Sequence, residues 1–210
     1  MSVTFPNETP DYRAARLGLL QRERELRREM EAVAAEIRAL PPGGAVPQDY
    51  EFDHVDANGV PAKVRLSELF RPGTEDLILY HFMFPRHRND KRPGPINGST
   101  AELPLEEGPC PSCIALLDSW EGAVPHVEGL GANIAAVAKA PIERVAAFAA
   151  ERGWRHLKLL SAANTNFKHD YHGEDEEGDL AWRTIVDSAS WKCWCRSPSC
   201  WRSRPGSSPS

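Results

Sequence analysis

Residues 110–122 have the sequence Cys-Pro-Ser-Cys-Ile-Ala-Leu-Leu-Asp-Ser-Trp-Glu-Gly, a pair of cysteines followed by a short apolar segment. The glycine at position 122 predicts where a helix ends. Pro111 suits the first helical position, because its missing N–H would have no partner there in any case. Cys110 is then the N-cap residue, beside free backbone amides and the positive end of the helix dipole. A thiolate is stabilised at such a position, where cysteine pKa values fall from about 8.5 to roughly 3.5–7.5.

The spacing of Cys110 and Cys113 brings two sulfur atoms close enough to form a disulfide or to share a metal ion. A zinc site usually needs a second pair of ligands some 12–20 residues away, whereas the next cysteine, Cys193, lies 80 positions on. The pattern therefore favours thiol–disulfide exchange, in which Cys110 attacks, a mixed disulfide forms, and the more buried Cys113 resolves it. Pro111 and Ser112 form the loop that supports the motif. One alternative is that the two cysteines are structural residues at a helix start. The other is a metal site, which the lack of a second ligand pair makes less favourable.

Strands and helices are predicted on both sides of the cysteine pair, from apolar runs, alternation and turn signals. The predicted elements are a hairpin at 49–70 around Asn58-Gly59, strands at 77–84, 133–138 and 157–160, and a helix at 141–153. This order predicts an α/β fold with right-handed crossovers in a mostly parallel sheet. The cysteine pair would lie where a strand ends and a helix begins, the position of the active site in open α/β sheets.

A long helix is predicted at the N-terminus. Thr9 and Pro10 form a helix-start signal, and apolar residues keep a spacing of three and four from Leu26 to Leu40 within an Arg- and Glu-rich segment. The helix should end before Pro41, so that residues 1–44 form an amphipathic helix with its linker. We interpret the helix as a dimerisation arm or, alternatively, as a helix that lies on its own domain.

Residues 85–109 form an unusually long loop that is basic in its first half, acidic in its second, and leads directly into Cys110. We interpret it as a mobile flap over the dithiol, with a solvated insertion as the alternative. His81 lies inside an apolar strand and is interpreted as a hydrogen-bonded core histidine rather than a catalytic base. Residues 169–172, His-Asp-Tyr-His, are interpreted as a polar loop rather than a set of metal ligands.

Composition excludes several classes of protein. The 210 residues carry a net charge of −5, which argues against nucleic acid or an anionic membrane as the main partner. No apolar run approaches the roughly 18 residues of a membrane span, and no secretory signal is recognisable. The five cysteines are an odd number and do not suggest a disulfide framework. We therefore expect a cytoplasmic protein.

Several separate motifs support a family resemblance. They are Tyr80-His81-Phe82-Met83-Phe84, the Cys110–Cys113 segment, Ala138-Lys139-Ala140-Pro141, Gly153-Trp154 and Asn166-Phe167-Lys168-His169-Asp170-Tyr171. Together, over about residues 9–179, they resemble the bacterial thioredoxin-like family of unknown function often described as predicted dithiol–disulfide oxidoreductases. That family is related to the peroxiredoxin and thiol-specific antioxidant branch of the thioredoxin fold. The resemblance implies a thioredoxin-like sheet with Cys110 and Cys113 as the redox pair, and it implies no particular substrate.

The chain departs from the family in two places. The loop 85–109 is longer than in much of the family. A proline, usually cis, precedes a further strand in thioredoxin-like proteins, but the candidate strand 180–186 has none before it, and Pro141 begins a helix instead. From residue 188 to 210 the chain contains eight Ser, three Pro, three Trp and three Cys. A metal site is a weak explanation, because Cys193, Cys195 and Cys200 lack a fourth ligand. Nucleic-acid binding is also a weak explanation, because the stretch has only four basic residues. We therefore interpret it as out-of-frame translation that replaces the normal C-terminus.

The sequence thus predicts an α/β protein with a thioredoxin-like mixed sheet flanked by helices, a long N-terminal helix and a disordered C-terminal tail. The expected organisation is a helical segment at 1–44, a thioredoxin-like domain at 45–187 that lacks its C-terminal part, and the tail at 188–210. The expected function is dithiol–disulfide exchange, without a cofactor or a metal ion. The expected substrate is a disulfide-containing protein or a small thiol, and a homodimer is one expected assembly. The alternatives are a thiol peroxidase and a non-catalytic assembly module that dimerises through the N-terminal helix.

Overall fold

A computed structural model describes residues 5–41, 45–56 and 58–175. The chain divides into two compact units, residues 1–44 and residues 45–210, which are described separately below. The candidate strand 180–186 and the tail 188–210, with its three cysteines, lie outside the described residues. Within the described part of the chain, none of the helices has an apolar stretch long enough to traverse a bilayer.

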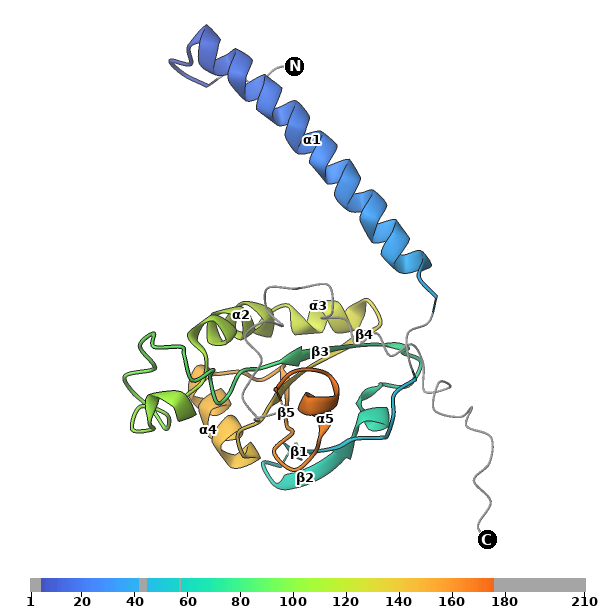
Figure 1. Cartoon of the computed structure of the whole chain (residues 1–210), viewed down its shortest axis with the longest axis vertical. Helices are drawn as coiled ribbons and strands as arrows, with labels where there is room; N and C mark the ends of the chain where they lie inside the picture. Colours follow the sequence, from blue (N-terminus) through green and yellow to red (C-terminus); the bar gives the residue numbers. More distant parts are fainter. Residues whose placement is uncertain (1–4, 42–44, 57, 176–210) are drawn as a thin grey trace. The chain divides into compact units, whose positions relative to one another are not determined.

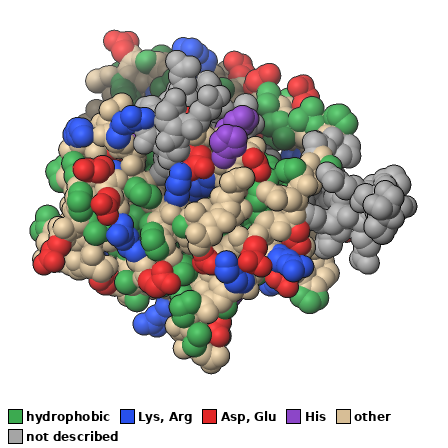
Figure 2. All heavy atoms as spheres, turned by 60° about the horizontal axis from the view of Figure 1, so that its bottom comes forward, with side chains coloured by type: hydrophobic (Ala, Val, Ile, Leu, Met, Phe, Trp, Pro, Cys, Tyr) green, Lys and Arg blue, Asp and Glu red, His purple; other side chains and the backbone are tan. Residues whose placement is uncertain are grey.

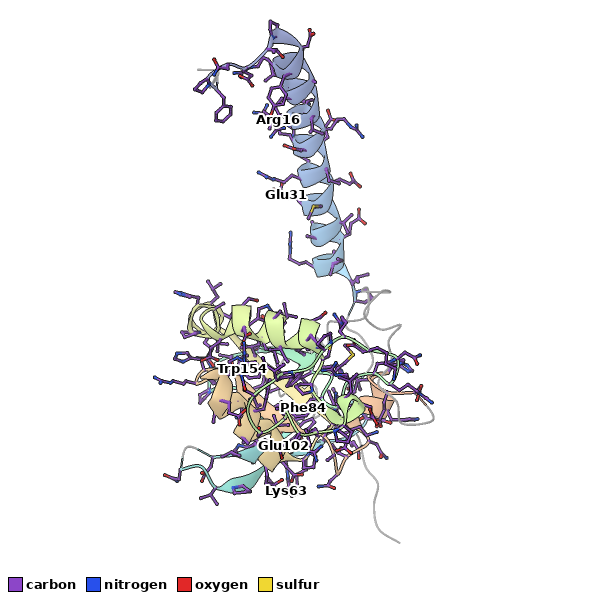
Figure 3. The ribbon with its side chains drawn as sticks, turned by 90° about the vertical axis from the view of Figure 1, so that its left-hand side faces the viewer. Arg16, Glu31, Lys63, Phe84, Glu102 and Trp154 are labelled. Atoms are coloured by element: carbon purple, nitrogen blue, oxygen red, sulfur yellow. The ribbon has the colours of Figure 1, made fainter. Side chains whose placement is uncertain are left out.

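The first unit is built on one helix, α1 (Pro10–Ala39), as the sequence predicts. Thr9 caps it, because its side-chain oxygen accepts a hydrogen bond from the backbone N–H of Tyr12 at 3.2 Å. No residue of α1 is buried, and its side chains project on all sides along its length, with Arg16 and Glu31 labelled in Figure 3.

The second unit contains a mixed five-stranded sheet (Figure 1). Its strands are β1 (Glu51–Val55), β2 (Pro61–Arg65), β3 (Asp76–His81), β4 (Ala132–Ala138) and β5 (Lys158–Ser161). The strand order is β2-β1-β5-β4-β3, in which β3, β4 and β5 are parallel and β1 is antiparallel to both β2 and β5. The predicted hairpin and the predicted parallel strands are therefore present. The protein belongs to the α/β class, as expected.

Helices complete this unit, and some of them were not predicted. They are α2 (Pro111–Glu121), α3 (Val124–Gly129), α4 (Ile142–Arg152) and α5 (Phe167–Asp170), with 3-10 turns at Leu66–Leu69 and Leu105–Glu107. α2 and α4 match the expected helices, and α2 begins at Pro111 as expected. The sequence analysis missed α3 and α5, because six and four residues are too few to show helical periodicity.

The two faces of the sheet carry separate cores. Ile134, Ala136 and Ala138 of β4 pack with α2, α3 and α4, whereas Ala135 and Val137 pack with residues of β1, β2, β3 and α5. This alternation is the period of a strand buried on both faces. Both cysteines of the pair belong to the first core, together with the aromatic residue Phe84 in the interior (Figure 3).

The strand predicted at 77–84 is shorter than expected, since β3 ends at His81. The backbone N–H of Phe82 still donates to Val137 of β4 at 3.0 Å, and the carbonyl of Phe84 accepts from Lys139 at 2.9 Å and from Ala140 at 2.7 Å, so the chain stays beside the end of β4 without regular strand pairing. The Phe84–Pro85 peptide bond that follows is cis. Residues 82–84 nevertheless stay buried, which explains the length of the apolar run in the sequence.

Candidate active site

The cysteine pair lies at the carboxyl end of β3, although a long loop separates the two in sequence. The backbone N–H of Cys110 donates to the carbonyl of Met83, two residues past β3, at 2.9 Å. Cys110 is the N-cap residue of α2, and Pro111 is its first residue. The predicted position, at a strand end and a helix start, is confirmed.

Both cysteines are free thiols, and both are buried. The exposed fraction is 0% for Cys110 and 1% for Cys113. These exposed fractions do not separate the two thiols, so the expectation that Cys113 is the more buried of the two stays a prediction. The loop 85–109 contributes to the burial of Cys110, because it places a side chain over it.

That side chain is Arg92. One guanidinium nitrogen, Nη2, lies 3.5 Å from Cys110 Sγ, and the other, Nη1, donates to Ser112 Oγ at 2.6 Å. Asp90 holds the guanidinium by accepting from Nε at 2.8 Å and from Nη2 at 2.6 Å. The hydrogen bonds from Arg92 lower the pKa of Asp90 to about 2, so this carboxylate is charged whenever the site is in use. Arg92 is thus a fixed cation beside Cys110.

A second arginine from the loop is buried and binds backbone. Arg86 Nη1 donates to the carbonyl of Arg92 at 2.6 Å, and its Nη2 donates to that of Pro109 at 2.7 Å. The backbone N–H of Arg86 donates to Gly108 at 2.8 Å. Arg86 therefore joins the segment that carries Arg92 to the segment that precedes Cys110. The loop 85–109 covers the dithiol as the sequence suggests, while its mobility stays a prediction.

The two thiols have opposite electrostatic surroundings. The pKa of Cys110 is lowered to about 6, first by a hydrogen bond with the Cys113 thiol, then by the first-turn amides of Cys113 and Ser112 and the charge of Arg92, against the effect of burial. The amides act as nearby dipoles, since the Cys110 side chain makes no well-aligned capping hydrogen bond. The pKa of Cys113 is raised by its hydrogen bond to Cys110, by burial and by the charge of Cys110. The pair thus has one acidic thiol and one that keeps its proton.

A tyrosine from β3 reaches the second thiol. Tyr80 Oη donates to Cys113 Sγ at 3.1 Å, and its ring packs edge-on against Trp120 of α2 with centroids 5.1 Å apart. Burial and the two cysteines raise the pKa of Tyr80, so its hydroxyl stays protonated.

A lysine from α5 is buried beside the segment that follows β3. Lys168 is 1% exposed, and its Nζ donates to the carbonyl of Phe82 at 3.0 Å. Burial lowers its pKa to about 7, while the charge of Cys113 acts in the opposite direction. Lys168 therefore places a cation with an altered pKa near the dithiol.

Two histidines singled out in the sequence are His81 and His169, and the expected hydrogen bond of His81 stays a prediction. His81 stacks on Phe167, with centroids 5.4 Å apart and ring planes at 10°, and burial lowers its pKa to about 3, which makes it a neutral core histidine. His169 is exposed, and its Nδ1 lies 3.4 Å from Asp170 Oδ1 at the end of α5, so the predicted polar loop 169–172 is helical in its first half. Among the described residues, no three His, Cys, Asp or Glu side chains are grouped so as to hold a metal ion.

Sequence reasoning missed three of the residues around the pair, Tyr80, Arg92 and Lys168. Tyr80 and Lys168 stood inside the motifs of the family resemblance, but their position there says nothing about where their side chains point. Arg92 was counted among the basic residues of the loop, with no signal that distinguished it from its neighbours. On the face shown in Figure 2, basic, acidic and apolar side chains are interspersed.

The chain is similar to several solved structures at low sequence identity. The crystal structure of Enterococcus faecalis AhpC is 17% identical, with a TM-score of 0.42, and covers 65% of this chain and 67% of that chain. Oxidized Prx3 from Vibrio vulnificus is 14% identical, with a TM-score of 0.41, over 67% of this chain and 76% of that chain. A candidate thioredoxin from Neisseria meningitidis is 13% identical, with a TM-score of 0.34, over 75% of this chain and 91% of that chain. These similarities are distant, and the fold class rests on the sheet topology itself.

The sequence comparisons give the family. No curated protein matches the chain. Residues 2–200 match the family described as bacterial protein of unknown function (DUF899), and the match extends past Asp179, where the resemblance based on motifs ended. The chain therefore belongs to this bacterial family of unknown function.

Proposed function

We propose that the protein is a dithiol–disulfide oxidoreductase. The Cys110 thiolate attacks one sulfur of a substrate disulfide, a bond forms between the two sulfurs, and the first substrate thiolate leaves and takes up a proton. Cys113 then attacks the Cys110 sulfur, which forms the Cys110–Cys113 disulfide and releases the second substrate thiolate. The two electrons of the dithiol pass to the substrate, and an external dithiol reductant returns them.

The observation that carries this proposal is the unequal pair at the start of α2. A thiol with a pKa near 6 is roughly 90% thiolate at neutral pH, whereas one near 9 is roughly 1% thiolate. Cys113 keeps its proton beside it and is available for the second step. A purely structural pair of cysteines does not need a fixed arginine and free amides around one sulfur.

The test uses the aromatic disulfide 5,5′-dithiobis(2-nitrobenzoate), whose reduction releases a coloured thiolate. Cys193, Cys195 and Cys200 are first replaced by serine so that only the pair reacts. The reduced protein should release two equivalents in two phases, and Cys113→Ser should release one and keep a stable mixed disulfide. Cys110→Ser should lose the fast first phase. Full disulfide-reductase activity in Cys110→Ser would overturn the proposal.

A thiol peroxidase is the second candidate, favoured by the complete burial of Cys110 beneath Arg92, because a peroxide is smaller than a disulfide. Cys110 would attack the peroxide O–O bond, giving a sulfenic acid and an alkoxide or hydroxide that takes up a proton. Cys113 would condense with the sulfenic acid and release water. Peroxide consumption that needs no disulfide substrate and disappears in Cys110→Ser would favour this reaction over disulfide reduction.

An assembly role is supported by α1 independently of the cysteines. Its exposed apolar residues follow a heptad spacing, at Leu19, Leu26, Met30, Val33, Ile37 and Leu40. Residues 10–28 contain six arginines against three acidic residues, whereas residues 29–39 contain one arginine against three glutamates. An antiparallel pair of α1 helices would place each basic part opposite an acidic part. We propose a second copy of this chain as the partner of α1.

Sedimentation of the full chain tests the assembly role. The wild type should be a dimer, and Leu26→Lys should be a monomer, because it puts a charge in the apolar stripe. Gln21→Lys, on the opposite side of the heptad, should leave the dimer intact. A wild-type monomer at all concentrations, or a dimer in Leu26→Lys, would overturn the assembly role.

A further inference from the structure

We propose that Tyr80 is a catalytic residue of the second step, in which its hydroxyl donates a hydrogen bond to the thiolate of Cys113 as that sulfur attacks the mixed disulfide. This inference rests on the proposed dithiol–disulfide exchange. It assigns a role to the groups around Cys113, the thiol of the second step. These groups take no part in the attack by Cys110.

The position of Tyr80 is fixed by two elements. Tyr80 pairs with Ala136 in the parallel ladder between β3 and β4, so its backbone is held on the edge strand of the sheet by the neighbouring strand β4. Its ring contacts Trp120, which lies seven residues after Cys113 on α2 and so, after about two turns, on the same side of that helix. The hydroxyl then lies 3.1 Å from Cys113 Sγ. A tyrosine hydroxyl is a donor at this distance, and a thiolate is an acceptor.

The contact matters most after the first attack. In the reduced protein, Cys113 is kept protonated mainly by its hydrogen bond to Cys110, then by burial and the charge of Cys110. When Cys110 becomes part of a mixed disulfide, its negative charge disappears and so does the acceptor for the Cys113 proton. Burial alone then opposes ionisation of Cys113, while the Tyr80 hydroxyl and the backbone at Met83 favour it.

A second favourable contribution comes from charge, since a charged Lys168 and an ionised Cys113 attract one another. The ammonium group of Lys168 is buried and attracted to the charge of Cys113. Lys168 is held by the carbonyl of Phe82, two residues after Tyr80 in the chain. Tyr80 donates directly to the reacting sulfur, whereas Lys168 acts through its charge.

The step balances without any further reactant. Cys113 loses its proton to solvent, and the first released substrate thiolate gains one. The Cys113 sulfur forms a bond to the Cys110 sulfur as the bond between Cys110 and the substrate breaks, and the second substrate thiolate leaves and is protonated. Tyr80 keeps its own proton throughout, because its pKa is raised.

The test compares the two phases of thiolate release from 5,5′-dithiobis(2-nitrobenzoate) in the protein with Cys193, Cys195 and Cys200 replaced by serine. Tyr80→Phe keeps the ring against Trp120 and removes the hydroxyl. The first phase should be within about twofold of the parent rate. The second should be slower by about tenfold or more, the factor that corresponds to a hydrogen bond to a charged group. The mixed disulfide at Cys110 should accumulate in the same period, as detected by mass spectrometry.

Tyr50→Phe is the matched control. Tyr50 Oη donates to Asp170 Oδ2 at 2.6 Å, so this variant also removes a tyrosine hydrogen bond, but in the core on the other face of the sheet. Both phases should keep the parent rates. If Tyr80→Phe is too unstable to assay, Tyr80→3-fluorotyrosine retains the ring and the donor and should resolve at the parent rate.

An unchanged second phase in Tyr80→Phe overturns the assignment, and so does an equal slowing of both phases, because the hydroxyl then acts on the whole site. A slowed second phase in Tyr80→3-fluorotyrosine overturns it too. Failure of the underlying exchange reaction would be seen elsewhere, as a first phase that survives in Cys110→Ser.

Discussion

At the scale of single residues, Arg92 adds a fixed positive charge beside Cys110 to the effects of Cys113 and the helix start. Its charge lowers the pKa of Cys110, and Asp90 fixes its position. We predict that Arg92→Met raises this pKa above its value of about 6. The thiolate present near pH 6 to 7 should decrease accordingly, as measured by its ultraviolet absorbance during a pH titration.

Lys91 provides the control for this prediction, because it is the neighbouring basic residue in the same loop and is exposed. Lys91→Met removes the same charge without removing a contact to sulfur, so the titration curve should match the parent. Equal curves for Arg92→Met and the parent protein would mean that the helix start and Cys113 alone determine the acidity of Cys110.

Lys168 gives a pH dependence of stability whose sign follows from its pKa. The folded value is about 7, below the ordinary 10.5, so between these values the unfolded chain binds more protons than the folded one. The free energy of unfolding should therefore rise with pH over this range, by at most about 1.4 kcal/mol per unit. Lys168→Met should lose this rise.

Urea unfolding at several pH values in a Cys113→Ser background measures the effect without titration of the neighbouring thiol. The stability difference between the parent and Lys168→Met should increase from pH 7 towards pH 10. A constant difference would show that the Lys168 ammonium is charged in the folded protein over the whole range.

The sequence predicted the positions of residues that lie within one short segment, but it did not predict contacts between residues far apart in the chain. The position of Cys110 and Cys113 follows from Pro111 and the apolar run after it, all within one short segment. The contacts of Tyr80 and Arg92 with sulfur join positions 33 and 18 residues apart, so they depend on the fold of the intervening loop. No local pattern in the sequence carries that information.

At the scale of elements, the same contrast applies to helix length. α1, α2 and α4 contain caps and periodic apolar residues, and all three were predicted with ends close to the observed ones. α5 has four residues and carries Lys168 into the core, yet its sequence resembles a polar turn. Its helical form depends on the burial of Phe167 against Phe52 and Tyr50 rather than on local propensity.

The glycines after α2 and α4 both mark helix ends in the sequence, but the structure distinguishes them. Gly153, after α4, has φ +75°, a left-handed conformation that costs other residues about 1–2 kcal/mol, whereas Gly122, after α2, has φ −73°. Gly153→Ala should therefore lower the free energy of unfolding by about 1 kcal/mol. Gly122→Ala, with open space around its Cβ, should be neutral or slightly stabilising. Urea unfolding of both variants checks this, and equal effects would contradict it.

At the scale of the whole molecule, the dithiol is assembled from segments that are far apart in the chain. The end of β3 supplies the acceptor for Cys110 N–H and the hydroxyl at Cys113, the loop 85–109 supplies Arg92, and α5 supplies Lys168. The groups supplied by β3, by the residues just after it and by α5 are fixed by the sheet or its core. The loop is held by side-chain to backbone hydrogen bonds, so we expect it to control access to the sulfur.

We expect Arg86 to hold this loop closed, because it donates to the carbonyls of both Arg92 and Pro109. Arg86→Lys keeps the charge but replaces the planar fork with a single ammonium group, which cannot reproduce both hydrogen bonds. Loss of one bond, at about 1 kcal/mol, should increase the open population about fivefold. Cys110 should then react faster with N-ethylmaleimide at about pH 8, where it is a thiolate in both proteins. Backbone amides of the loop should exchange faster with solvent deuterium.

Arg144→Lys is the control, since Arg144 contacts the same loop through an exposed ion pair with Glu107 at 3.1 Å, and such pairs contribute little. Its alkylation rate should equal that of the parent. Faster exchange throughout the sheet in Arg86→Lys would indicate global destabilisation rather than loop opening, and an unchanged alkylation rate would mean that the reagent reaches Cys110 without displacing the loop. Because Arg86 touches neither sulfur, a change confined to the loop and Cys110 would separate access to the dithiol from its acidity.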